Sequence, residues 1–230
     1  MTGSADPEIV TLDQLEIEPD PAEVLRYLGY PADAHPDPRI EAQVHSTLRS
    51  SRGRLCPRGV YAIHPVLSRT RRRLELSGGA AFSGPVGEFL AAARRVAVFV
   101  ATAGPEVVRM ADEALRSNDT LGGLVFNALG SHVAEAVVHR IAADLRTRIE
   151  PGEGLTLPYS PGYCGIPLTQ QREVFRLVNA SGIGVELLPS LIMKPIKSVS
   201  GLFGIGPASD VTAVGNPCDH CALVDCNMRR

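Results

Sequence analysis

The sequence is short of aromatic residues and of net charge. Its 230 residues include no tryptophan and 5% aromatic residues, so the 44% of hydrophobic residues must build a largely aliphatic core. The formal net charge is -2, and a polyanion such as nucleic acid is therefore not an expected partner. A chain of this length can bury one substantial core.

Long apolar runs are absent as well. No segment approaches the roughly 20 uninterrupted apolar residues of a membrane-spanning helix. Residues 1–12 have neither the basic start nor the apolar stretch of a signal peptide. We therefore expect a cytoplasmic protein with no membrane partner.

Several catalytic and nucleotide-binding motifs are missing. The sequence has no P-loop, no G-x-S-x-G elbow and no H-E-x-x-H pair. The glycines of the run SGLFGIG, at residues 200–206, have the wrong spacing for a phosphate loop and favour a strand approached closely by other backbone. The basic run Arg69–Arg73 is interpreted as a solvated strand or turn.

The spacing of apolar residues and of helix caps predicts a mixture of helices and strands. Asp20-Pro21, Asp37-Pro38 and Asp119-Thr120 are typical helix starts, the last opening a helix to about Ile149. Two further helices are expected, one from Gly104-Pro105 to about Ser117 and one capped by Thr169 and running to about Asn179. Strands are expected at residues 60–67, 73–76, 95–102, 184–188, 198–205 and 210–214.

These elements do not alternate regularly, and no glycine fingerprint follows a strand. The pattern therefore predicts an α+β fold with a twisted, mainly antiparallel sheet flanked by helices. We expect an N-terminal arm over residues 1–19, one domain over residues 20–215 and a cysteine-rich tail over residues 216–230.

The tail carries three of the five cysteines. Cys218, Cys221 and Cys226 have a spacing that brings thiolates onto one metal ion, and clustering of this kind in a reducing compartment indicates metal or redox chemistry. Tetrahedral zinc needs a fourth ligand, for which His220, Cys164 or Cys56 are candidates. An iron–sulfur cluster fits the same thiolates, and an unstructured reduced tail is the remaining alternative.

Three segments together resemble a known family. The loop Ser160-Pro161-Gly162-Tyr163, the segment Leu187–Gly201 ending in S-V-S-G, and Ala134-Glu135-Ala136 upstream are similar to motifs of the activation domain of cobalamin-dependent methionine synthase. The cysteines of the tail and Arg229 resemble the ends of shorter, stand-alone members. The likeness is strongest over residues 121–230.

The resemblance implies a role in reactivating an oxidised corrinoid. In the family, the domain binds S-adenosylmethionine beside the P-G-Y loop and docks on a cobalamin-carrying protein. It implies a ligand site at Glu135, Ser160, Gly162 and Tyr163, with cobalamin supplied by the partner. The residues themselves leave a structural turn with a packed tyrosine as an alternative, and Arg94 or Arg95 as structural partners of Glu135.

Two positions depart from the family pattern. Pro158 stands where the family carries an arginine four residues before the glycine, and the stretch Val211–Ala213 lacks the tyrosine expected in a last strand. Both losses weaken the case for S-adenosylmethionine. Three functions remain: a reactivation module that binds this ligand, an iron–sulfur activator that reduces cobalt, and a non-enzymatic adaptor with a zinc-stapled tail.

Overall fold

A computed structural model describes residues 7–31, 33–216 and 218 of the chain. The helices and strands follow in the order β1 (Ile9–Leu12), α1 (Pro21–Tyr27), α2 (Pro38–Ser51), β2 (Arg58–Thr70), β3 (Arg73–Leu76), β4 (Ala81–Ser83), α3 (Val86–Phe89), β5 (Arg95–Thr102), α4 (Glu106–Arg116), α5 (Thr120–Arg148), β6 (Glu153–Leu155), α6 (Gln171–Leu177), β7 (Glu186–Leu187), β8 (Met193–Lys194), β9 (Ser198–Pro207) and α7 (Ala208–Ala213). Two short 3₁₀ helices lie at Leu168–Gln170 and Ala180–Ile183.

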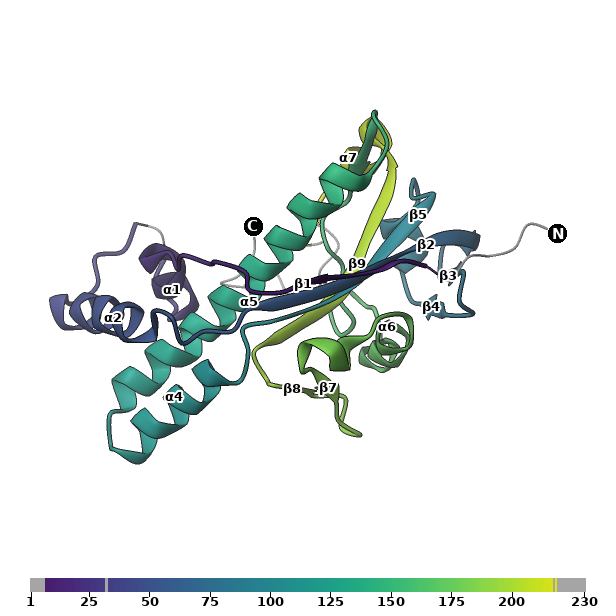
Figure 1. Ribbon diagram of the computed structural model, residues 1–230. Helices are drawn as coiled ribbons and strands as arrows, with labels where there is room; N and C mark the ends of the chain where they lie inside the picture. The colour runs from purple at the N-terminus through teal and green to yellow at the C-terminus, as the bar shows by residue number, and fades with distance from the viewer. Residues whose placement is uncertain (1–6, 32, 217, 219–230) are drawn as a thin grey trace.

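The main sheet is antiparallel and is twisted (Figure 1). Its strands follow the order β4-β3-β2-β5-β9-β6, and β1 adds to β2 at one side. β5 is central, as the uninterrupted apolar run predicts, and pairs with β2 and β9 over its whole length. The predicted α+β class with a mainly antiparallel sheet is confirmed.

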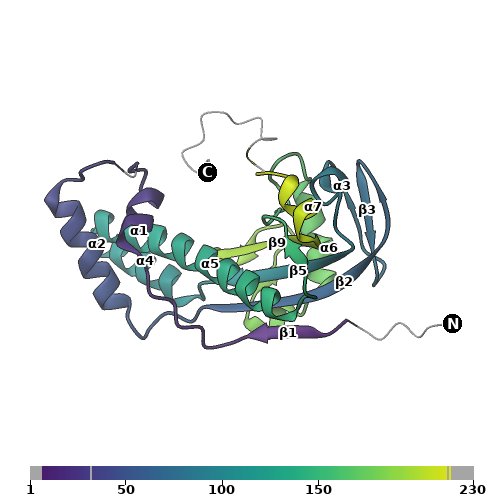
Figure 2. The same cartoon turned by 90° about the horizontal axis from the view of Figure 1, so that it is seen from above.

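Helices cover both faces of this sheet. The long helix α5 lies on one face, where Val137, Ile141 and Leu145 pack against β2, β5 and β9 (Figure 2). On the other face α3, α6 and the segment after α6 enclose a second cluster around Leu74, Val98 and Leu202. The first half of α5 continues past the sheet and packs with α1, α2 and α4 into a third cluster.

Helix α5 passes the length and composition test for a membrane span, but 61% of its most apolar window is buried inside the fold. Burial of this kind is expected of a core helix. The caps at Asp20, Asp37 and Asp119 are present, and each carboxylate accepts a backbone N–H from the first turn of its helix.

One predicted strand and one predicted helix cap are wrong. The segment predicted as a strand at 210–214 belongs to helix α7, which starts directly after Pro207 ends β9 and buries Val211 against β6 and β9. Thr169 does not cap α6, because it already lies inside a 3₁₀ turn that begins after Pro167. Of the predicted strand at 184–188, residues Glu186–Leu187 form β7, which pairs with β8 outside the main sheet.

Candidate functional site

The S-V-S-G segment forms the first half of β9, and this half has an open edge. On the side away from β5, β6 pairs with residues 205–207, and Tyr159 forms an isolated bridge with Leu202. In the described part of the chain no strand pairs with Ser198–Gly201 on that side. Ser198 and Val199 are partly exposed, whereas Ser200 and Gly201 are buried, so the backbone of this half of β9 is unpaired by any described strand and is reachable at its start.

The proline of the P-G-Y loop explains why pairing stops there. Continuing the antiparallel register from the Tyr159–Leu202 bridge would place Pro161 opposite Ser200. Proline has no N–H to donate to the Ser200 carbonyl, and so the ladder ends at this point. The hydroxyl of Ser200 is also buried without a hydrogen-bond partner in the described chain.

The loop itself is a closed turn. The Gly162 N–H donates to Ile166 O at 2.8 Å, and the Tyr163 N–H donates to Ser160 O at 3.2 Å. Gly162 has φ +91°, a conformation that glycine adopts without a steric penalty. The N–H groups of Gly162 and Tyr163 are thus used inside the turn, and the interaction left to Tyr163 is through its ring, which is 69% exposed.

Glu135 lies at the border of the buried stripe of α5, as its helical spacing predicts. Ala128 and Ala142, on the same side of the helix, are buried, whereas Leu124 is exposed. Glu135 is half-buried and has no ion pair among the described residues. Arg95 is not its partner, because Arg95 pairs with Glu153 instead.

A basic residue that sequence reasoning missed contacts the same helix as Glu135. Lys197 is half-buried, and its Nζ donates to the Ser131 hydroxyl at 2.9 Å, one helical turn before Glu135. Burial lowers the pKa of Lys197 below its usual value. The sequence indicates Lys197 as a candidate only through its position immediately before the S-V-S-G run.

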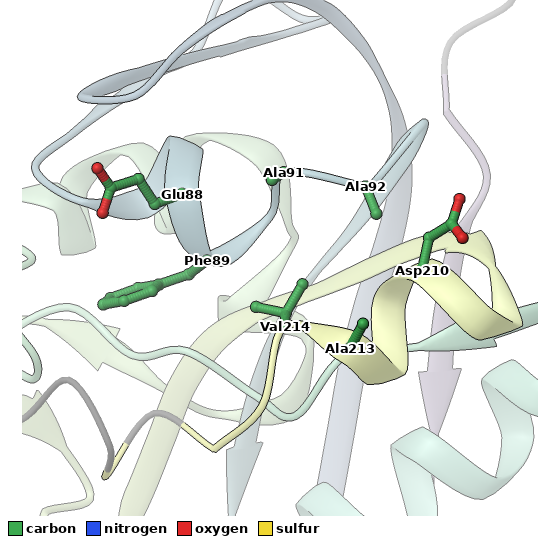
Figure 3. A pocket seen from close by; sticks show the side chains of 7 residues that line it. All are labelled: Glu88, Phe89, Ala91, Ala92, Asp210, Ala213 and Val214. Carbon is green, nitrogen blue, oxygen red and sulfur yellow. The ribbon is translucent and has the colours of Figure 1, made fainter.

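Two pockets lie elsewhere. One of about 300 Å³ is lined by Glu88 and Phe89 of α3, by Ala91 and Ala92, and by α7 and Val214 (Figure 3). Another, of about 200 Å³, lies between α4 and α5 and reaches Lys197. Neither Glu135 nor the P-G-Y loop lines either of these two pockets.

The predicted metal ligands are mostly outside the described residues. Cys221, Cys226 and His220 fall there, whereas Cys218 is half-buried and its N–H donates to Asn216 Oδ1 at 2.9 Å. Cys164 packs against the core cluster of α6, and Cys56 is exposed beside Gly104. Within residues 7–216 and 218, no three His, Cys, Asp or Glu side chains form a metal-binding group.

The α+β fold, with an antiparallel sheet covered by helices on both faces, can be compared with known proteins. The sequence profile of the "vitamin B12 dependent methionine synthase, activation domain" family matches residues 87–221, and the chain therefore belongs to this family. Among solved structures, the MetH reactivation domain bound to AdoHcy is similar, with a TM-score of 0.64 and 18% identity. The match covers 91% of this chain and 82% of that one. No curated protein sequence matches the chain.

The structural match extends the similarity beyond the segment that the family profile covers. Strands β1 to β4 and helices α1 and α2 precede residue 87, yet the structural alignment includes most of them. The fold of that reactivation domain is therefore shared by nearly the whole chain.

Proposed function

We propose that this chain is a reactivation module for a corrinoid-dependent methyltransferase such as methionine synthase. In this proposal it binds S-adenosylmethionine or a related ligand and docks on the corrinoid protein, in the cytoplasm. Family membership supports the class of function, and the AdoHcy bound to the similar reactivation domain supports the class of ligand.

The observation that carries the proposal is the unpaired edge of β9 at Ser198–Gly201, which begins where the chain leading into the P-G-Y turn stops pairing. A ligand along this edge can exchange hydrogen bonds with outward-pointing backbone groups near Ser198 and Ser200. The exposed ring of Tyr163 is suited to stack on a purine. The Glu135 carboxylate is suited to bind the ammonium of an amino acid.

The chemistry of the ligand fixes what the protein has to do. When bound, S-adenosylmethionine would supply a methyl group to reduced cobalt of a cobalamin on the partner, with S-adenosylhomocysteine as the leaving group. The residues of this chain orient the sulfonium, satisfy the charges of the amino-acid end, and exclude water from one side. The reducing electron comes from an external donor.

Calorimetric titration with S-adenosylmethionine and S-adenosylhomocysteine tests the ligand. We expect Glu135→Gln to weaken binding about 10-fold or more, because a charge-assisted hydrogen bond contributes about 1.5–3 kcal/mol. Glu113→Gln is the matched control, since Glu113 lies on α4, is exposed and pairs with Arg109. Absence of binding by the unmodified protein would remove the methyl-donor role.

We further propose that the tail binds a metal through Cys218, Cys221 and Cys226, with Cys164 or His220 as a fourth ligand. The C-x-x-C spacing supports this proposal. Anaerobic purification with elemental analysis separates the alternatives. Iron and sulfide indicate a redox activator of the corrinoid, zinc indicates a stapled tail, and a metal-free protein contradicts both.

A further inference from the structure

Lys197 is held against α5 by a matched pair of residues. Its Nζ donates to Ser131 Oγ at 2.9 Å. Its aliphatic stem crosses Gly130, where an added Cβ would lie 2.8 Å from Lys197 Cγ. The glycine therefore leaves the room in which the stem lies, and the serine fixes its end.

The backbone of Lys197 is fixed as well. Its carbonyl accepts the Ala103 N–H at 2.9 Å and the Thr102 hydroxyl at 3.3 Å, at the end of β5. Ser198, which follows, donates its hydroxyl to Thr102 Oγ1. A lysine anchored at both ends loses little further conformational entropy on binding an anion.

The charge of Lys197 has no counter-charge in the described chain. Its Nζ donates to a neutral hydroxyl, and no carboxylate of the described residues lies within ion-pair distance. Burial accordingly lowers its pKa, with no neighbouring acid to oppose the effect. Such a partly desolvated cation favours an anionic ligand, because the anion removes the cost of leaving the charge unpaired.

Glu135 is the complementary charge on the same stretch of helix. Ser131 and Glu135 are four residues apart, and side chains at that spacing are neighbours, with Cβ atoms about 6 Å apart. Glu135 and Lys197 do not form an ion pair with each other. Ser131 thus contacts one half-buried cation and lies one helical turn before a half-buried anion, and neither charge has an ionic partner among the described residues.

An α-amino acid zwitterion carries the same two charges on one carbon atom. We infer that Lys197 binds the carboxylate of the amino-acid portion of the ligand while Glu135 binds its ammonium. The α-carbon of the ligand then lies near Ser131. This inference rests on the proposed function. Pro158, before the P-G-Y turn, offers no cation for the carboxylate, and in this inference Lys197, held against α5, takes that task.

The test compares two nucleosides that differ in the amino-acid group. S-adenosylhomocysteine carries the zwitterion, whereas 5′-methylthioadenosine lacks it. By calorimetric titration we expect Lys197→Met to weaken binding of S-adenosylhomocysteine about 10- to 100-fold, the range for loss of one charge-assisted hydrogen bond. Binding of 5′-methylthioadenosine stays unchanged.

Two controls separate binding from folding. Lys194→Met removes an exposed lysine three residues earlier and leaves both affinities unchanged. Lys197→Met keeps or raises the melting temperature, because a half-buried charge without a counter-charge among the described residues is replaced by an apolar chain of similar volume. Lys197→Arg restores part of the affinity for S-adenosylhomocysteine, since it restores the cation.

The outcomes are distinguishable. Full affinity of Lys197→Met for S-adenosylhomocysteine overturns the role of Lys197 and leaves the proposed function standing. Equal loss for both nucleosides also overturns it, because the lysine would then act on the shape of the groove. If the unmodified protein binds neither nucleoside, the proposed function and the inference fail together.

Discussion

The three glycines of β9 provide a graded test of how closely this strand is packed. Gly201, Gly204 and Gly206 fall in the SGLFGIG run, and substitution of each by alanine adds the same methyl group. What that methyl group meets differs at the three positions. The expected loss of stability therefore ranks the three variants in an order fixed by the structure.

The worst position is Gly206, where an added Cβ would lie 2.3 Å from the backbone carbonyl oxygen of Ala92. At Gly201 the Cβ would lie 2.8 Å from both the Tyr159 carbonyl oxygen and Phe99 Cζ. At Gly204 the nearest atoms are ends of side chains at 3.0 Å, which can shift by a few tenths of an ångström. Backbone cannot shift so cheaply, and strands β9 and β5 hold Phe99 fully buried.

Overpacking of a well-packed core costs about 1–3 kcal/mol, and more where the backbone has to move. Replacing glycine by alanine also gains about 0.4–1 kcal/mol by restricting the unfolded chain. We therefore expect Gly204→Ala to change stability by less than about 1 kcal/mol, Gly201→Ala to cost about 1–3 kcal/mol, and Gly206→Ala to cost about 3 kcal/mol or more.

Urea unfolding followed by circular dichroism measures the three values, with the m-value checked for constancy. Gly182→Ala is the control, because its Cβ would meet the exposed Asn179 side chain alone. Gly201→Ala should in addition weaken ligand binding, since it displaces the Tyr159 backbone that leads into the P-G-Y turn. Equal stability of Gly201→Ala and Gly204→Ala would refute the packing described for β9.

Three further predictions concern single interactions. Asp119→Ala removes the cap that accepts the Gly122 N–H at 2.8 Å and should lower the free energy of unfolding by about 0.5–2 kcal/mol, whereas Asp119→Asn, measured by the same urea titration, should lose less than half of that. Tyr61→Phe removes a hydroxyl that donates to Asp144, and both burial and this hydrogen bond raise the pKa of Tyr61. The contribution of the protonated hydroxyl to stability is therefore present below about pH 10 and is lost at higher pH. The variant should be less stable at pH 7 and should show a smaller decrease in melting temperature at alkaline pH. Burial lowers the pKa of His132, whose Nε2 accepts the Asp20 N–H, and the stability of the protein should therefore fall as the pH drops below about 6.5. A His132→Gln variant whose melting temperature falls as steeply as that of the unmodified protein between pH 7.5 and 5.5 would contradict this.

Local signals in the sequence located most of the fold. The Asp-Pro pairs mark the starts of α1 and α2 because the carboxylate caps the first turn and proline suits the first helical position. The run at residues 95–102 gives β5 its bounds, since a strand buried on both faces needs no polar alternation. These elements are determined by interactions between residues close in sequence.

The last element shows where local signals fail. Val211 and Thr212 favour a strand by propensity, but β6 ends its pairing at Pro207, and no described strand remains to pair with the segment that follows. A single helical turn buries Val211 against β6 and β9 instead. Tertiary packing thus decides a segment that propensity alone assigns wrongly.

The candidate site was only half visible in the sequence for the same reason. The position of Glu135 at the border of an apolar stripe follows from helical periodicity. The contact of Lys197 with Ser131 joins residues 66 positions apart, and nothing in the spacing of either segment predicts it. The family motif predicts a P-G-Y loop with exposed backbone groups, whereas in the structure the N–H groups of Gly162 and Tyr163 form hydrogen bonds inside the turn.

The role of the motif is therefore better understood through its proline. An exposed strand edge invites pairing with another chain, and proteins usually protect it. Here β6 and Tyr159 cover the second half of the edge, and Pro161 stops the ladder before it reaches Ser200. The closed turn of Gly162 and Tyr163 then stands beside the uncovered half without pairing to it. A proline that ends one ladder thus leaves a short, serine-lined edge, and such an edge is more useful to a small ligand than to a second strand.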